Sequence, residues 1–195
     1  MPSIVLATLN ARYAHASLGL RCLRANLGEL RDDSEIVEFV LGVRAEEAVE
    51  RLLADAPRIV GFGVYVWNVA ETTRIVAALK TVAPQVVVVV GGPEVSHEVE
   101  AQPICALADY VVTGWGDITF AVLARQLVRG SRPPVKVLAG AQQPLAELAL
   151  PCSEFSDADL RRRHVCVEAS RGCPFRCEFC LSALERTAWP FPLDA

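Results

Sequence analysis

Short apolar runs alternate along this chain with segments in which apolar residues recur every three or four positions. The runs predict β-strands, and the recurring positions predict amphipathic helices. Pro57, Pro84 and Gly130 each follow a helical segment and end it. The predicted strands span residues 4–9, 35–41, 59–66, 86–90 and 110–113, and the predicted helices lie within residues 20–30, 45–53, 75–82 and 118–128.

This alternation, repeated about five times, predicts a parallel sheet with helices on both faces. We expect an α/β fold of the flavodoxin-like (Rossmann-like), doubly wound kind, with five strands in the order 2-1-3-4-5. A run over residues 135–138 predicts a small extra strand. We expect the sheet domain over residues 1–139 and a linker without clear periodicity over residues 140–163. A last segment over residues 164–195 opens with a strand at 164–169.

Composition restricts the class of protein. Of the 195 residues, 52% are hydrophobic and 22% charged, which is typical of a globular chain. The net charge of −4 argues against a surface of massed lysine and arginine, so no nucleic acid is expected as a partner. The longest apolar runs are far too short to span a bilayer, and the N-terminus lacks the pattern of a secretion signal. We therefore expect no membrane association and a cytoplasmic location.

Glycine and polar residues follow the predicted strands. Open parallel sheets bind ligands at the carboxyl ends of their strands, and glycine lets the backbone come close to a ligand. Neither a dinucleotide-binding nor a P-loop glycine motif is present, which weakens the hypotheses of a dinucleotide ligand and of a P-loop nucleotide site. The candidate ligand-binding residues are Asn10, Tyr13 and His15 after strand one; Gly63, Val64, Tyr65 and Asn68 at strand three; Gly91, Gly92 and Pro93 after strand four; and Gly114 and Gly116 after strand five.

A CxxxCxxC motif near the end of the chain contains Cys173, Cys177 and Cys180. Closed structural metal sites usually have four protein ligands, whereas reactive sites keep one position open. Three thiolates can hold three irons of a [4Fe-4S] cluster and leave the fourth iron free for a small molecule. The alternative is a zinc-stapled flavodoxin-like domain in which Cys166 or His164 supplies a fourth ligand. Residues 181–186 begin a helix after the motif.

The order of these features resembles that of cobalamin-dependent radical S-adenosylmethionine (radical SAM) proteins. Five βα units, a linker and a strand lead into the cysteine loop, and an aromatic residue, Phe179, precedes the last cysteine. The resemblance implies a cobalamin-binding Rossmann-like domain followed by a truncated start of a radical SAM barrel. It implies cobalamin, a [4Fe-4S] cluster and S-adenosylmethionine as small-molecule cofactors, with the cysteines as cluster ligands and the backbone of Phe179 against adenine.

The chain departs from the best-known cobalamin domains in the loop after strand one. Those domains carry Asp-x-His-x-x-Gly there, whereas Tyr13 stands here where the aspartate would precede His15. A carboxylate normally orients a histidine that ligates a metal, so the residue that would position His15 on cobalt is missing. Residues 63–65 stand where the family has Ser-x-Leu, and the glycine pair 91–92 follows at a similar interval. Many radical SAM members hold cobalamin without a histidine ligand.

By this resemblance, the chain carries the first strand and cysteine loop of a barrel that needs several more βα units. We expect the chain alone to bind cobalamin and to be inactive toward S-adenosylmethionine. Either the product is truncated or a separate chain completes the barrel. A stand-alone cobalamin-binding module with vestigial cysteines is the alternative. Arg171 and Arg176 either add positive charge beside the cluster or face solvent.

Overall fold

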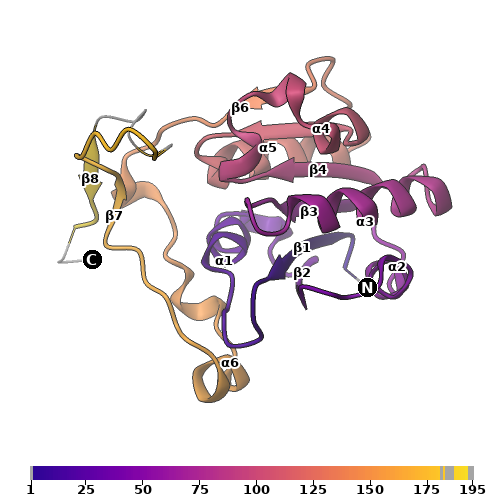
Figure 1. Cartoon of the computed structure of the whole chain (residues 1–195), viewed down its shortest axis with the longest axis horizontal. Helices are drawn as coiled ribbons and strands as arrows, with labels where there is room; N and C mark the ends of the chain where they lie inside the picture. The colour runs from indigo at the N-terminus through magenta and orange to yellow at the C-terminus, as the bar shows by residue number, and fades with distance from the viewer. Residues whose placement is uncertain (1, 181, 183–186, 193–195) are drawn as a thin grey trace.

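A six-stranded parallel sheet forms the centre of the molecule, with helices on both faces (Figure 1). The computed structural model describes residues 2–180, 182 and 187–192. The strand order is β2-β1-β3-β4-β5-β6, so the predicted order of the first five strands is confirmed, and the short extra strand joins the edge. The strands of this sheet are β1 (Ile4–Asn10), β2 (Ser34–Val40), β3 (Ile59–Gly63), β4 (Val87–Gly91), β5 (Tyr110–Thr113) and β6 (Val137–Ala139).

Two helices cover one face of the sheet, and three cover the other. One apolar cluster joins the first face to α1 (Leu18–Ala25) and α5 (Gly116–Val128). A second cluster joins the opposite face to α2 (Ala45–Leu53), α3 (Val69–Val82) and α4 (Pro103–Leu107). The connections contain the 3-10 turns η1 (Gly28–Leu30), η2 (Pro93–Val95) and η3 (Val99–Ala101).

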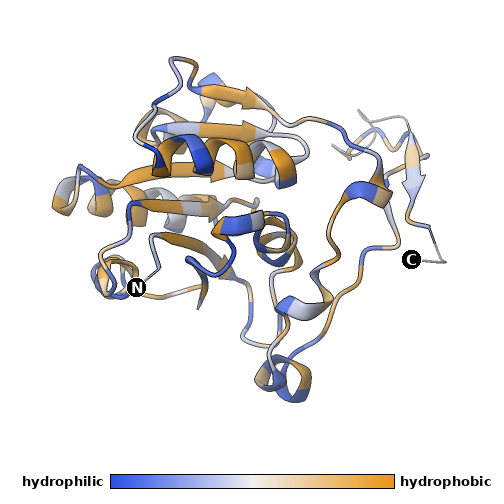
Figure 2. Cartoon of the chain, turned by 180° about the vertical axis from the view of Figure 1, so that it is seen from behind, coloured by the Kyte–Doolittle hydropathy of each residue, from blue (hydrophilic) through white to orange (hydrophobic). Residues whose placement is uncertain are grey.

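Strand β4 lies in the interior of the sheet, and its four valines are buried. Val88 and Val90 join the cluster with α2, α3 and α4, whereas Val87 and Val89 join the cluster with α1 and α5. Because side chains alternate between the two faces, a strand that is covered on both faces needs apolar residues at consecutive positions. Figure 2 shows hydrophobic residues along the central strands and on the helix faces turned toward them.

Two of the predicted elements are shorter in the structure. The helix expected over 20–30 ends at Ala25, and Gly28 follows in a left-handed conformation with φ of 62°. The strand expected over 59–66 ends at Gly63. The chain turns there because the side chain of Asn68 accepts a hydrogen bond from the backbone N–H of Tyr65 at 2.8 Å. Side-chain hydrogen bonds of this kind compete with the hydrogen bonds of a strand.

The part of the chain after residue 140 contains short elements that flank the sheet domain in Figure 1. The strand expected over 164–169 is wrong. His164 makes one isolated bridge with His15, and the next strands are the antiparallel pair β7 (Ser170–Gly172) and β8 (Ala188–Pro190). A first barrel strand needs parallel neighbours along its length, and in the described part of the chain the single His164 bridge is not continued over residues 165–169. The helix expected over 181–186 lies outside the described residues, apart from 182. The other short elements after residue 140 are η4 (Leu145–Glu147), η5 (Pro151–Glu154) and α6 (Asp157–Arg162).

Candidate functional site

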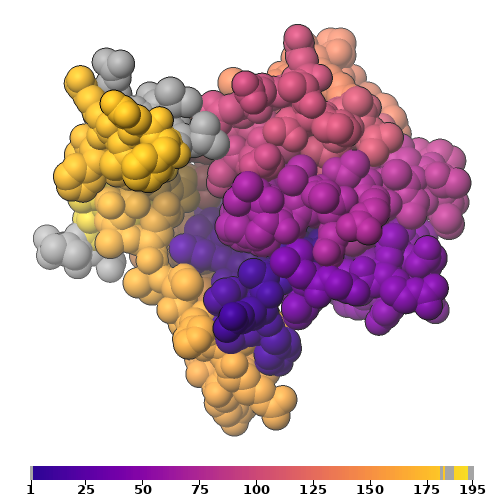
Figure 3. All heavy atoms as spheres, in the orientation of Figure 1, coloured from indigo at the N-terminus to yellow at the C-terminus, as the bar shows by residue number. Residues whose placement is uncertain are grey.

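A cavity of about 510 Å³ opens at the carboxyl ends of the central strands, between the sheet and helices α1 and α5. In open parallel sheets, ligands bind at this edge. The volume falls within the range of roughly 300–1,000 Å³ that is usual for small-molecule sites. Figure 3 shows a hollow where the C-terminal segment, in orange and yellow, faces the sheet domain.

Three glycines form the floor of the cavity. Gly61 and Gly63 lie two residues apart on β3, and Gly91 on β4 pairs with Gly63. Because side chains alternate along a strand, Gly61 and Gly63 face the same side as Ile59, which belongs to the cluster with α1 and α5. A Cβ atom at Gly63 would meet its nearest neighbours at 3.4 and 3.5 Å, which is ordinary contact. Longer side chains at Gly63 would therefore occupy space that the cavity leaves open.

The turn after β4 requires glycine for its backbone conformation. Gly92 has φ of 117°, and a Cβ atom there would lie 2.5 Å from the carbonyl oxygen of Val64. An L-residue cannot occupy this position without moving the backbone of the neighbouring turn. The absence of a side chain at Gly92 permits this close approach, and the backbone N–H of Val64 donates to the carbonyl oxygen of Gly91 at 2.8 Å, which joins the ends of β3 and β4.

Apolar side chains from the two helices form the walls, and a later segment forms the roof. Leu20 and Leu23 come from α1, and Phe120 comes from α5. Residues Glu168, Ser170, Arg171 and Gly172 line the opposite side. We call residues 168–172 the strap. The cavity is therefore enclosed jointly by the sheet domain and by the segment that precedes the cysteine motif.

Arg171 fixes the strap to the first turn of α5. Its guanidinium donates to both carboxylate oxygens of Asp117, at 2.6 and 3.1 Å, and its Nε donates to Glu168 at 3.0 Å. The guanidinium also lies 5.1 Å from the ring centroid of Trp115. Burial opposes the charged form of Arg171, but Asp117 and Glu168 outweigh that cost and raise the pKa of Arg171 above its usual value. The solvent-facing role expected for Arg171 is wrong, because its side chain is 12% exposed and pairs with two carboxylates. Its role as positive charge beside a cluster stays a prediction.

Cys22 of α1 lies beside this cluster and lines the same cavity. Burial, together with the negative charges of Asp117 and Glu168, raises the pKa of the Cys22 thiol to about 12. A thiol with so high a pKa stays protonated and is a poor nucleophile at neutral pH. Cys22 therefore contributes a small apolar surface to the wall, as its place in the apolar pattern indicates.

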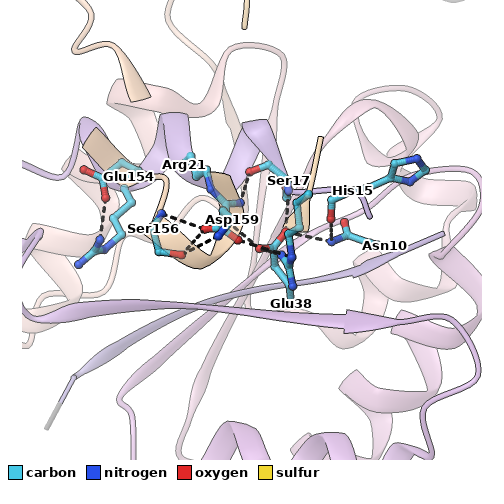
Figure 4. A network of polar contacts seen from close by, with 10 residues as sticks. Asn10, His15, Ser17, Arg21, Glu38, Glu154, Ser156 and Asp159 are labelled. Atoms are coloured by element: carbon cyan, nitrogen blue, oxygen red, sulfur yellow. Dashed lines mark hydrogen bonds and ion pairs between the residues drawn. The ribbon is translucent and has the colours of Figure 1, made fainter. Parts of the chain in front are cut away.

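A buried carboxylate holds the loop after β1. Glu38 of β2 accepts hydrogen bonds from the Asn10 side chain at 2.9 Å and from the Ser17 backbone at 2.6 Å (Figure 4). It also pairs with Arg21 at 2.9 Å and with Arg163 at 2.7 Å. Burial opposes ionisation of Glu38, but these hydrogen bonds outweigh it, so the pKa of Glu38 lies below its usual value. The loop that carries His15 is thus held by hydrogen bonds to the Glu38 carboxylate and from the Asn10 amide.

Tyr13 and His15 lie on this loop, outside the residues that line the cavity. Tyr13 is half exposed and lies under the guanidinium of Arg163, 4.6 Å from its ring centroid. The rings of His15 and His164 are 6.4 Å apart. Among the described residues, no carboxylate hydrogen-bonds the His15 ring, which agrees with the missing aspartate of the sequence motif.

The turn after β3 contains an aromatic pair and a buried amide. Tyr65 and Trp67 stack with ring centroids 4.5 Å apart and planes inclined by 6°. Asn68 is fully buried, and its amide donates to Thr8 and to the carbonyl oxygens of Leu9 and Gly63. The Asn68 side chain therefore holds the turn in place through hydrogen bonds without lining the cavity, whereas Tyr65 lines the cavity.

The cysteine motif follows the strap. Cys173 is half buried, whereas Cys177, Cys180 and Phe179 are exposed. Within the residues that the structure describes, no three histidine, cysteine or acidic side chains are placed to hold a metal ion. This arrangement gathers neither a [4Fe-4S] ligand set nor the zinc set that would use Cys166 or His164. The donor chemistry of three thiols suits a cluster, but their positions here do not form one.

The structure brings together most of the glycine-rich strand ends and separates the first loop from them. Several cavity residues had no recognised sequence signal, because helix walls and a distant strap come together only in three dimensions. Of the predicted ligand-binding residues, the cavity is lined by Gly63, Tyr65, Gly91, Gly92, Pro93, Gly114 and Gly116, and not by Asn10, Tyr13, His15, Val64, Asn68 or Phe179. The lining residues that the sequence did not indicate include Gly61, Leu20, Leu23, Asp117, Phe120 and Arg171.

Known proteins resemble this chain in sequence and in fold. An uncharacterized methyltransferase of Pyrococcus horikoshii is 28% identical over 191 residues, covering 86% of this chain and 41% of that protein. The radical S-adenosylmethionine methyltransferase TsrM from Kitasatospora setae matches with a TM-score of 0.62 and 17% identity, over 98% of this chain and 43% of that one. The cobalamin-dependent S-adenosylmethionine radical enzyme OxsB matches with a TM-score of 0.66 and 16% identity, over 100% and 30%. The chain spans less than half the length of each of these proteins.

The B12 binding domain family matches residues 4–124, from β1 into α5. This stretch contains the glycine floor and both helix walls of the cavity. It ends before the strap, so the match concerns the sheet domain. More than half of the chain is covered, and the chain therefore belongs to the B12 binding domain family.

Proposed function

We propose that this chain is the cobalamin-binding part of a radical SAM enzyme and that it holds cobalamin at the carboxyl edge of its sheet. The observation that carries the proposal is the glycine-floored cavity within the family's own domain. Gly63 leaves out a side chain where a bulky ligand must approach the backbone, and Gly92 allows the tight turn at the mouth of the cavity. We assign residues 1–139 to this domain, 140–163 to a linker and 164–195 to the start of the radical SAM part.

The lining of the cavity suits a ligand that is large and mainly apolar with a few polar groups. Leu20, Leu23 and Phe120 supply apolar walls, while backbone groups of the strand ends supply hydrogen-bonding partners. Cobalamin is larger than the enclosed volume, so its remaining parts extend over the open edge of the sheet. The stacked Tyr65 and Trp67 stand at that edge and offer an aromatic surface.

The radical SAM assignment rests on the cysteine motif and on the two fold relatives, whose names state S-adenosylmethionine chemistry. In this proposal Cys173, Cys177 and Cys180 become ligands of a [4Fe-4S] cluster once the rest of a barrel orders their loop. Bound cobalamin supplies a carrier for methyl groups, and the chain's own residues hold and shield it. Methyl transfer by the whole protein is part of the same proposal and is supported by the methyltransferase relatives.

Titration of the purified chain with hydroxocobalamin, followed by absorbance and calorimetry, tests the binding function. We expect one equivalent to bind the wild-type chain. Gly63→Val places a branched side chain in the cavity at ordinary contact distance, and we expect it to weaken binding by roughly 100-fold. Ala106→Leu is the matched control, because Ala106 is exposed on α4 at the opposite face and should bind as the wild type does.

The competing outcomes are distinct. If the Gly63→Val and wild-type chains bind hydroxocobalamin with equal affinity, the ligand does not bind in this cavity. Anaerobic reconstitution with iron and sulfide separates the radical SAM assignment from a stand-alone cobalamin module. A brown protein that loses its colour after Cys177→Ser supports the cluster, whereas a colourless protein that still binds hydroxocobalamin supports the module.

A further inference from the structure

The strap separates two cavities. Beyond it lies a second, apolar cavity of about 300 Å³ between α1 and the segment 148–167. Cys22, Glu168 and Arg171 line both cavities and therefore form the partition between them. Movement of Arg171 would open the roof of the glycine-floored cavity and join the two spaces.

The contacts of Arg171 divide into two sets. Its hydrogen bonds to Asp117 cross from the strap to α5, and so does its contact with the ring of Trp115. Its bonds to Glu168 stay within the strap, because the two residues are three positions apart. Trp189 of β8 meets Trp115 edge-on at 5.3 Å and adds a second crossing contact.

This division makes opening energetically accessible. A buried arginine that lost all its partners would be strongly destabilised. When the strap lifts from α5, Arg171 keeps the Glu168 carboxylate, while the Asp117 pair and the aromatic contacts with Trp115 break. Asp117 is 6% exposed in the closed arrangement and would become accessible at the cavity wall. In their charge pairs, the closed and the lifted arrangements of the strap thus differ mainly by the bidentate Arg171–Asp117 pair.

We infer that the strap is a gate over the cobalamin cavity and that the Arg171–Asp117 pair is its latch. The inference rests on the proposed function for the identity of the ligand. Cobalamin enters and leaves when the latch opens, and the closed latch holds the strap, and with it the beginning of the cysteine loop, against the cavity. Arg171 is in this sense a positioning residue.

A latch that closes equally over the empty and the loaded cavity slows association and dissociation by the same factor. Asp117→Asn keeps the shape of the side chain and removes its charge. We expect both rate constants for hydroxocobalamin to rise by about tenfold, the size expected for weakening one charge-assisted bidentate pair. The dissociation constant should change by less than about threefold, since the two rates move together. Stopped-flow absorbance measures both rates, and Arg171→Gln should reproduce them.

Hydrogen–deuterium exchange of the strap amides, without ligand, supplies an independent measurement. Exchange should rise by about tenfold in Asp117→Asn and by a smaller factor in Glu168→Gln, because only Asp117 lies across the opening. Arg176→Gln is the control for charge in the adjacent cysteine loop, since Arg176 is exposed and should leave exchange and binding rates as they are. Circular dichroism confirms that each variant keeps its fold.

The outcomes separate the gate from the binding function. Unchanged strap exchange in Asp117→Asn and Arg171→Gln would overturn the latch. Faster exchange with unchanged cobalamin rates would overturn the gate, and so would equal effects of Asp117→Asn and Glu168→Gln. Failure of the wild-type chain to bind hydroxocobalamin would overturn the proposed function and cobalamin gating with it, while the exchange measurement still decides the latch.

Discussion

Between Ile4 and Val128 the buried positions are mainly apolar, whereas the segment from 140 to 192 contacts that domain largely through charged side chains. Leu145 and Leu148 are the buried apolar residues of the later segment within the described part of the chain. Its ion pairs with the sheet domain are Glu154 with Arg24 and Arg31, Asp159 with Arg21, Arg163 with Glu38, and Arg171 with Asp117.

The two regions therefore respond differently to perturbation. Apolar burial is non-directional and scales with the area removed from water, so the sheet domain tolerates small displacements. A buried ion pair contributes little net stability, yet losing one partner leaves the other charge uncompensated. Such pairs fix one arrangement of the later segment, and we expect this segment to detach as a unit when they break. The proposed gate over the cavity requires this behaviour.

The largest effect is expected from the apolar core. Leu79 of α3 is fully buried, and Leu79→Ala should lower the free energy of unfolding of the sheet domain by about 3 kcal/mol. Val82 lies about one turn further on the same helix and is 67% exposed. Val82→Ala should therefore change the free energy of unfolding by less than about 0.5 kcal/mol. Urea denaturation followed by circular dichroism compares them. Similar losses in the two variants would contradict the burial pattern.

A smaller and local effect is expected where α6 meets the sheet domain. Asp159→Asn removes the charge that pairs with Arg21 and Arg163, and should lower the free energy of opening of α6 by about 2 kcal/mol. Native-state hydrogen exchange at Leu160 and Arg163, whose amides donate within α6, measures this opening. Asp157→Asn is the control on the same helix, since its carboxyl group is 88% exposed. Loss of global stability in Asp159→Asn would show that the segment does not detach separately.

The smallest effect is a dependence on pH. The pKa values of Glu38 and Asp159 both lie below their usual values of 4.5 and 3.8, because hydrogen bonds from Arg21 and other donors outweigh the cost of burial. The unfolded or detached state therefore binds more protons on acidification. The attachment is complete above about pH 5 and weakens as the pH falls from the usual pKa values of 4.5 and 3.8 through the lower values of the folded protein. Amide chemical shifts of α6 should move over this interval while those of β4 stay fixed; a coincident change would contradict separate attachment.

The apolar pattern was sufficient for the sheet. Alternating runs and helical periodicity predicted the five strands and their covering helices, because each follows from local sequence, and the common flavodoxin-like arrangement supplied their order. The glycine-rich strand ends were predicted for the same reason, and Gly63, Gly91 and Gly92 do line the cavity. The expectation for residues 164–169 failed because pairing of a strand depends on a neighbour that the pattern itself does not specify.

The sequence by itself determined the fold of the first domain and the ligand-binding edge, since periodicity and turn chemistry act between neighbours in the chain. Only the tertiary structure decided that Arg171 meets Asp117, 54 residues away, and that Glu38 holds both the first loop and the linker. The periodicity of the sequence does not indicate which charged side chains will pair with one another. Their pairing is set by where the folded backbone brings them, and for this protein that pairing closes the cavity.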